Sequence, residues 1–361
     1  MSSVHNFNAG PAMLPPAVLE QVQAELRDYQ GRGMSIMEMS HRAREYEAIN
    51  AGAESAFKRL LGVGDGYRVL FLQGGASTQF AMVPMNFLPP GGVADYLLTG
   101  SWAEKAHEEA AALGRARIAA STRDGSYRRV PRIDEITLGP DAAYVHLTSN
   151  ETIHGIAWPT FPDTGAAPLV ADMSSDILSR PIDAGKFSLI YAGAQKNLGP
   201  SGVTVVLLRE AWLAKANQGV PTMLRYTTHV KNNSLYNTPP TFAVYVLNLV
   251  LQWVEKTGGL KAMAERNDRK ARLLYAAIDQ SGGFYRGHAE PESRSRMNVT
   301  FRLPSEALEK QFVSESQSLG MVGLAGHRSV GGIRASIYNA VAVESCQALA
   351  SFMHDFARRN G

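Results

Sequence analysis

Two helical patterns open the chain. Apolar residues recur at helical spacing from Val18 to Leu26, directly behind two prolines, and Gly31 supplies a stop. This spacing predicts a first helix over roughly 16–29. A second run of helical spacing predicts another helix from about Arg44 to Leu61.

After residue 61 the pattern changes to short, nearly continuous apolar runs separated by helix-like segments. Runs of this length without alternation are typical of strands that are covered on both faces. The runs are Val69–Leu72, Tyr96–Thr99, Ala116–Ala119, Tyr144–Leu147, Leu169–Ala171, Leu189–Ala192 and Val203–Leu208. They predict an α/β fold with a mostly parallel, seven-stranded sheet flanked by helices.

The last hundred residues follow a different pattern. A long helix from about 258 to 274 precedes a Gly-rich turn, and after it two strands alternate with two helices. The strands are expected at Met297–Leu303 and around Ile333–Ile337, and the helices near 305–319 and 343–358. We therefore expect a smaller α+β C-terminal domain. The predicted division is an N-terminal arm over 1–15, a large domain over 16–255 and a small domain over 256–361, with the helix that begins near Thr241 as the hinge.

Length and composition agree with this picture. The 361 residues suffice for about two domains, and 45% hydrophobic with 19% charged residues exclude disorder, collagen and a coiled coil. A net charge of +3 over this length does not call for a nucleic-acid partner. The one cysteine, Cys346, excludes an intrachain disulfide, and no Cys/His cluster has zinc spacing. No signal peptide or membrane span is visible, so we expect a cytoplasmic protein.

Glycine-rich segments are the first candidates for chemistry. Gly62, Gly64 and Gly66 resemble half of a dinucleotide fingerprint, but they precede a strand instead of following one. The segment from Gln73 to Thr78 does follow a strand and leads into a helix, where small residues let backbone N–H groups meet an anion. A plain strand-to-helix turn explains that segment as well.

Lys196 is the strongest single candidate. It lies in a loop of small residues after a buried strand, a setting in which an amine can be desolvated enough to react with a carbonyl. Asp172 ends a neighbouring strand. A strand-end carboxylate and a strand-end lysine suit a pyridoxal phosphate site, in which the acid keeps the pyridine nitrogen protonated and the amine holds the aldehyde. The alternatives are a solvated lysine and a helix N-cap.

Two further strand ends carry candidates. Trp102 begins a helix for which Ser101 is a natural cap, and its ring could stack on a planar ligand or simply join the core. Thr152 follows another strand end. Four strand-to-helix junctions thus bring candidates to one edge of the sheet, which is where open parallel sheets bind ligands.

Two segments are rich in groups that bind anions. They are His41-Arg42-Ala43-Arg44 near the start, and His327-Arg328 with Arg334 near the end. Arginine forks match phosphate and carboxylate oxygens two at a time, so a phosphorylated substrate would explain both segments. Ordinary surface charge is the alternative for each residue.

Taken in order, these motifs resemble the family of phosphoserine aminotransferases, a class V group of the fold-type I pyridoxal phosphate enzymes. The resemblance covers nearly the whole chain. It rests on the segments Asn6–Ala12, Met39–Arg42, Phe71–Gly75, Val83–Asn86, Ala194–Pro200, Tyr236–Pro240 and Gly326–Arg334.

The resemblance implies a role for each candidate. Lys196 would bond covalently to the cofactor, Asp172 would bind its pyridinium nitrogen, Trp102 would stack on its ring, and Thr152 would bind near its hydroxyl. The cofactor phosphate would be held by Ala76, Ser77 and Gln195, and by Asn237 and Thr238 from the partner subunit of a homodimer. Arg334 would bind the substrate α-carboxylate, and His41, Arg42, His327 and Arg328 its distal phosphate or carboxylate.

The implied activity is reversible transfer of the amino group of L-glutamate to 3-phosphohydroxypyruvate in serine biosynthesis. Ser77 stands where some members have an arginine, so substrate preference, including the four-carbon phosphorylated keto acid of vitamin B6 synthesis, stays open. The alternatives are an alanine- or serine-glyoxylate aminotransferase and a non-catalytic phosphate-ligand binding protein. A cysteine desulfurase is disfavoured because Cys346 falls in the closing helix.

Overall fold

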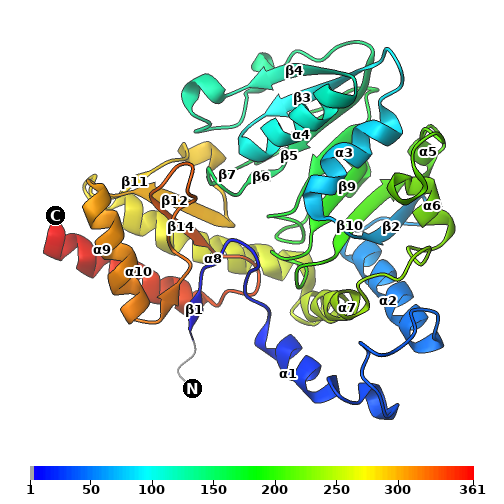
Figure 1. Ribbon diagram of the computed structural model, residues 1–361. Helices are drawn as coiled ribbons and strands as arrows, with labels where there is room; N and C mark the ends of the chain where they lie inside the picture. The colour runs from blue at the N-terminus through cyan, green and yellow to red at the C-terminus, as the bar shows by residue number, and fades with distance from the viewer. Residues whose placement is uncertain (1–3) are drawn as a thin grey trace.

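A computed structural model describes residues 4–361 of the chain. Its centre is a seven-stranded sheet with the strand order β2-β10-β9-β8-β5-β3-β4. Figure 1 shows this sheet, with all of its strands except β8 labelled. The strands are β2 (Tyr67–Leu72), β3 (Val93–Leu98), β4 (Arg115–Ser121), β5 (Ala142–Thr148), β8 (Leu169–Asp172), β9 (Phe187–Gly193) and β10 (Thr204–Arg209). β10 runs antiparallel to both of its neighbours, β2 and β9, and all other neighbouring pairs are parallel. The seven apolar runs of the sequence thus form one mostly parallel sheet, and the predicted fold class is confirmed.

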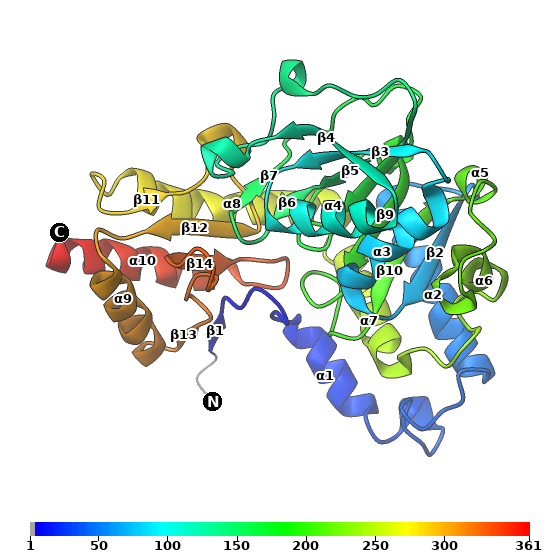
Figure 2. The same ribbon diagram turned by 45° about the horizontal axis from the view of Figure 1, so that its top comes forward.

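Helices cover both faces of this sheet, as Figure 2 shows. One face carries α3 (Gly75–Phe87), α4 (Ser101–Leu113), α5 (Glu210–Leu213) and α6 (Tyr226–Lys231); the other carries α1 (Pro16–Glu25), α2 (Arg44–Leu61) and α7 (Thr241–Lys256). Alternate residues of a strand point to opposite faces, so Val69 and Phe71 of β2 join one core while Leu70 and Leu72 join the other. Two buried faces are the reason that the strands are continuous apolar runs.

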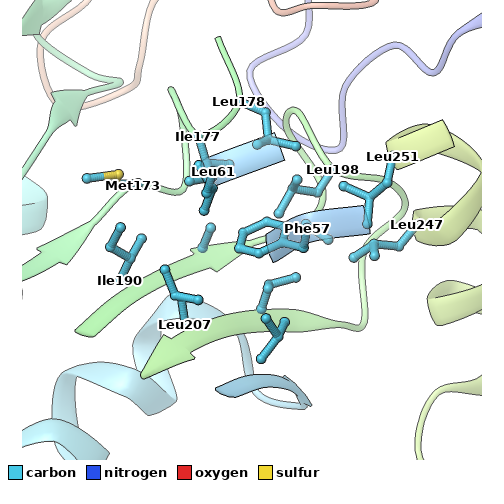
Figure 3. Close-up of a cluster of buried hydrophobic side chains, with 14 of the residues drawn as sticks. Phe57, Leu61, Met173, Ile177, Leu178, Ile190, Leu198, Leu207, Leu247 and Leu251 are labelled. Carbon is cyan, nitrogen blue, oxygen red and sulfur yellow. The ribbon is translucent and has the colours of Figure 1, made fainter. Parts of the chain in front are cut away.

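The core beneath α2 and α7 is drawn in Figure 3. Phe57 and Leu61 of α2, together with Leu247 and Leu251 of α7, pack in one cluster with strand residues such as Ile190. The exposed fraction of Phe57 is 1%. This layer fixes α2 and α7 against the back of the sheet.

A second, separate core lies in the C-terminal part of the chain. It is built by α8 (Gly259–Asp279), α9 (Glu306–Ser318), α10 (Val343–Asn360) and a three-stranded antiparallel sheet of β11 (Arg286–Gly287), β12 (Asn298–Arg302) and β14 (Ile333–Ser336). The N-terminal arm joins it, because β1 (His5–Asn6) pairs with β13 (Met321–Val322) and Phe7 is fully buried there. The domain boundaries at 15 and 255 stay a prediction.

Two helices differ in length from their predictions. The first ends at Glu25, because the chain turns to bring Tyr29 edge-on against Tyr245 of α7, whose hydroxyl donates to Glu25. The long C-terminal helix continues to Asp279, since Ala277 and Ile278 still pack into the second core. Among residues 4–361, no helix has both the length and the apolar character needed to cross a membrane.

Replacing Phe57 by Ala tests this arrangement of layers. A buried phenylalanine between helix and sheet leaves a cavity when truncated, so the free energy of unfolding should fall by about 3–5 kcal/mol. The measurement is equilibrium urea denaturation. Ile133→Ala serves as the control, because Ile133 is 70% exposed and its loss should change stability by less than about 0.5 kcal/mol. Equal effects of the two variants would contradict the packing.

Candidate active site

A cavity of about 280 Å³ lies at the carboxyl ends of the central parallel strands. Larger cavities exist, including one of about 710 Å³ beside α8, but it contains neither the candidate lysine nor the candidate aspartate. Nine of the candidate residues line the smaller cavity: Ala76, Ser77, Trp102, Thr152, Asp172, Gln195, Lys196, His327 and Arg334. Residues from five strand or helix ends therefore meet at one point.

Lys196 follows β9 in a tight turn closed by backbone bonds to Ala194. Its Nζ donates to Thr152 Oγ1 over 2.8 Å, and Gly10 of the N-terminal arm packs on its stem. Desolvation disfavours the charged amine and lowers the pKa of Lys196 to about 8, although the nearby carboxylates Asp172 and Glu151 oppose the shift. An amine with this pKa is partly neutral, and so nucleophilic, near neutral pH.

Asp172 is the last residue of β8, and β9 runs parallel beside it. Its side chain is 4% exposed, and one oxygen accepts the N–H of Ser174 over 2.8 Å. The carboxylate thus closes a turn. This side-chain-to-backbone contact resembles the N-cap contact that was the alternative role for Asp172. Burial raises the pKa of Asp172, while Ser174 and Lys196 lower it. A buried carboxylate with room beside it in a cavity is suited to bind a cationic nitrogen of a ligand.

Trp102 lies in the first turn of α4, with its ring 5.6 Å from Lys196 Nζ. The prediction that Ser101 caps this helix is wrong. Ser101 is already inside the helix, and its Oγ lies 3.3 Å from His154 Nε2. The carboxylate of Glu151, from the short strand β6 (Asn150–Glu151), instead accepts the N–H groups of Trp102 and Ala103. Burial raises the pKa of Glu151 to about 7, against the effect of those two bonds.

The first turn of α3 borders the same cavity. Gly75, Ala76 and Ser77 line it, and no side chain caps this helix. The first N–H groups of a helix have no partner within the helix and carry the positive end of its dipole. Gly75 leaves open space at the position where a Cβ would stand. The turn after β2 can therefore bind an anion.

Part of the cavity wall is cationic. Arg334 of β14 is half-buried, its Nε has no hydrogen-bond partner among the described residues, and burial lowers its pKa. Desolvation, followed by the charges of Arg334, Arg328 and Lys105, lowers the pKa of His327. Cations crowded together in this way favour an anionic ligand.

Five candidates lie outside this cavity. Arg42, Thr238 and Arg328 are exposed, and His41 and Asn237 are half-buried, but none of them is part of the cavity wall. Among residues 4–361 no group of His, Cys, Asp and Glu side chains is arranged to hold a metal ion. Cys346 is buried in α10, away from the cavity.

Several residues in and beside the cavity were not predicted. Glu151 directly precedes Thr152 and does not itself line the cavity. The helix that it contacts begins 50 residues earlier, so no local pattern reveals the contact. Ala9 and Gly10 do line the cavity, and only their Pro/Gly-rich setting in the N-terminal arm hinted at an irregular, tightly packed segment.

Comparison with known proteins gives consistent matches. Residues 4–349 match the family described as class-V aminotransferases. A phosphoserine aminotransferase of Herpetosiphon aurantiacus is 63% identical over 359 residues, which are 99% of this chain and 100% of that protein.

Two solved structures match over their full lengths. The phosphoserine aminotransferase from Bacillus circulans subsp. alkalophilus is 60% identical, with a TM-score of 0.98 and complete coverage of both chains. A PLP-bound phosphoserine aminotransferase from Trichomonas vaginalis is 40% identical, with a TM-score of 0.93 over 98% of this chain and 100% of that one.

The electrostatics of the cavity predict the titration of Lys196. In cofactor-free protein, reductive methylation followed by peptide mass spectrometry should show half-maximal labelling of Lys196 near pH 8, whereas exposed lysines require a pH near 10.4. Asp172→Asn should move the midpoint of Lys196 lower still, since the Asp172 charge raises its pKa. An unchanged or higher midpoint in that variant would contradict the assigned charge contact.

Proposed function

The chain belongs to the class-V aminotransferase family, and from this we propose that it is a phosphoserine aminotransferase. The proposed reaction is reversible transfer of the amino group of L-glutamate to 3-phosphohydroxypyruvate, giving O-phospho-L-serine and 2-oxoglutarate. One observation carries the proposal: a single cavity joins a desolvated amine, a buried carboxylate and a cationic wall. The full-length relatives named above support the same substrate.

The cavity fits pyridoxal 5'-phosphate as cofactor. Asp172 would bind the pyridinium nitrogen, Trp102 would lie against the ring, and Thr152 would bind near the ring hydroxyl. The open first turn of α3, with Ala76, Ser77 and the neighbouring Gln195, would hold the phosphate. Bound in this way, the cofactor supplies an electron sink for the substrate α-carbon.

Lys196 has two roles in this proposal. Its amine would tether the cofactor in the resting enzyme, and as a free amine it would take the proton from the substrate α-carbon. A pKa of about 8 keeps a useful fraction of the amine neutral at neutral pH. Thr152 Oγ1 orients the amine through the 2.8 Å hydrogen bond.

Charge selects the substrate. Arg334 would bind the α-carboxylate, and His327 with Arg328, His41 and Arg42 would bind the distal phosphate of one substrate or the γ-carboxylate of the other. Guanidinium forks suit both anions. Ser77 adds no charge at the cavity wall, so these cations carry the selectivity. An alanine- or serine-glyoxylate enzyme is the weaker candidate because its substrates have no distal anion to use them.

We propose a homodimer with sites at the subunit interface. Asn237, Thr238, His41 and Arg42 do not line the cavity of one chain, and contribution from the partner subunit would complete it. Large apolar side chains are exposed on α1, on the segment after it, and beside Asn237. They are Leu19, Leu26, Met34, Met37 and Tyr236. Such surfaces suit burial against a second copy. The cytoplasm stays the expected compartment.

Replacing Lys196 by Ala should lower turnover by at least about a thousandfold, because both the tether and the proton carrier are lost. The assay measures glutamate formed from phosphoserine and 2-oxoglutarate, beside alanine with glyoxylate as the competing pair. Lys310→Ala, an exposed lysine on α9, is the control and should keep the wild-type rate. Faster turnover of the alanine pair by the unmodified enzyme would favour the glyoxylate alternative. Protein that binds no cofactor would favour the binding-protein alternative.

Mixed dimers test the shared site. Lys196→Ala and Arg42→Ala chains should each be nearly inactive alone. If Arg42 acts across the interface, half of randomly mixed dimers contain one intact site, so co-expression should restore about a quarter of wild-type activity. Co-expression of Lys196→Ala with Asp172→Asn is the control, because both residues act in the site of their own chain and every site in the mixture therefore lacks one of them. Equal, negligible activity of both mixtures would contradict the arrangement of Arg42.

A further inference from the structure

Glu151 is a fully buried acid that has no role in the proposed reaction. It is the last residue of β6. Its Oε2 accepts the backbone N–H of Trp102 over 3.2 Å, and its Oε1 accepts that of Ala103 over 2.9 Å. Both carboxylate oxygens therefore accept hydrogen bonds from the first turn of α4.

This helix has no cap of its own. Its N-cap residue is Gly100, which has no side chain, and Ser101 Oγ contacts His154 instead. The N–H groups of a first turn need acceptors, and a negative charge there also complements the helix dipole. Glu151 supplies both from a distant part of the chain. The start of α3 has no such side chain and stays open to a ligand, whereas the start of α4 is closed.

Gly100 is shaped to this contact. A Cβ at residue 100 would lie 2.5 Å from Glu151 Cδ and 2.6 Å from its Oε2, far inside contact distance. The backbone there is extended, so glycine is required by the carboxylate beside it rather than by an unusual dihedral angle. The two residues form one packed unit.

The contact fixes the backbone that carries Trp102. The indole Nε1 is buried and has no hydrogen-bond partner among the described residues, so no hydrogen bond of the ring itself sets its orientation. The neighbours of Glu151 are also held: Asn150 bonds Ser175 and Asn298, and Thr152 bonds Lys196. The anchor at the start of α4 is therefore rigid.

We propose that Glu151 is a positioning residue that holds the Trp102 ring against the cofactor by binding two N–H groups in the first turn of α4, those of Trp102 and Ala103. The proposal rests on the proposed function, since it needs a cofactor ring in the cavity. Glu151 touches neither cofactor nor substrate and acts through Trp102. The charges that face it are those of Asp172 and Lys196.

Glu151→Gln is the sharpest test. Glutamine keeps the shape but offers one acceptor and one donor, so one N–H of α4 loses its partner and meets another N–H. We expect the reconstituted variant to bind pyridoxal phosphate about tenfold more weakly, the equivalent of one charge-assisted hydrogen bond. We also expect the visible circular dichroism band of the bound cofactor to fall by about half or more at saturation, because its ring is less firmly oriented.

Ser305→Ala is the matched control. Ser305 Oγ caps α9 by accepting the N–H of Leu308, remote from the cavity, so its loss should lower thermal stability without changing the cofactor band. Gly100→Ala is the second variant, and it should reproduce the Glu151→Gln spectrum by displacing the carboxylate.

The outcomes separate cleanly. If Glu151→Gln lowers only thermal stability, as Ser305→Ala does, while cofactor affinity and dichroism match the wild type, the positioning role is wrong. If Glu151→Gln does not fold, Gly100→Ala decides by the same two readouts. A wild-type protein that shows no cofactor band would instead overturn the proposed function itself.

Discussion

Burial of opposite charges at one edge of the sheet is the constraint on which the site depends. Parallel strands are covered by helices on both faces. At the carboxyl ends of the strands, polar side chains lie outside the apolar layers and are still shielded from water. Asp172 and Lys196 emerge there from adjacent strands. Desolvation raises the pKa of the acid and lowers that of the amine, and each charge partly offsets the burial of the other. The lowered pKa of Lys196 is thus mainly a consequence of its burial in the fold.

Two helices that begin at this edge use the same physics in different ways. Each has a first turn of unpaired N–H groups with a positive dipole end. At α3 small residues leave those groups open, which suits a ligand anion. At α4 the carboxylate of Glu151 occupies them, which suits a helix that has to hold an aromatic ring still. A strand-to-helix junction is a ligand site only when no protein side chain has filled it first.

Much of this was readable in the sequence, for identifiable reasons. Continuous apolar runs reveal strands such as β9 because both faces are buried, and polar residues directly after them, including Asp172 and Lys196, must meet at one edge. Contacts between segments that are distant in the sequence could not be predicted from it. Ser101 satisfies every local rule for a cap, yet Glu151 takes that role from a strand 50 residues away. The end of α1 likewise depends on Tyr245, a partner more than 200 residues distant.

The site also spans the junction of two cores, and hydrogen bonds between buried amides cross that junction. Lys196 follows β9 of the large sheet, whereas Arg334 stands on β14 in the C-terminal part. Between them Asn150 bonds Asn298 over 2.8 Å, and Asn197 accepts the N–H of Asn339 over 3.0 Å. Buried amide pairs of this kind add little net stability, but they tolerate only one register, since a shifted pair leaves costly unsatisfied groups. The amide pairs therefore help to fix the position of Arg334, which would bind a carboxylate, relative to Lys196, which would take the α-proton.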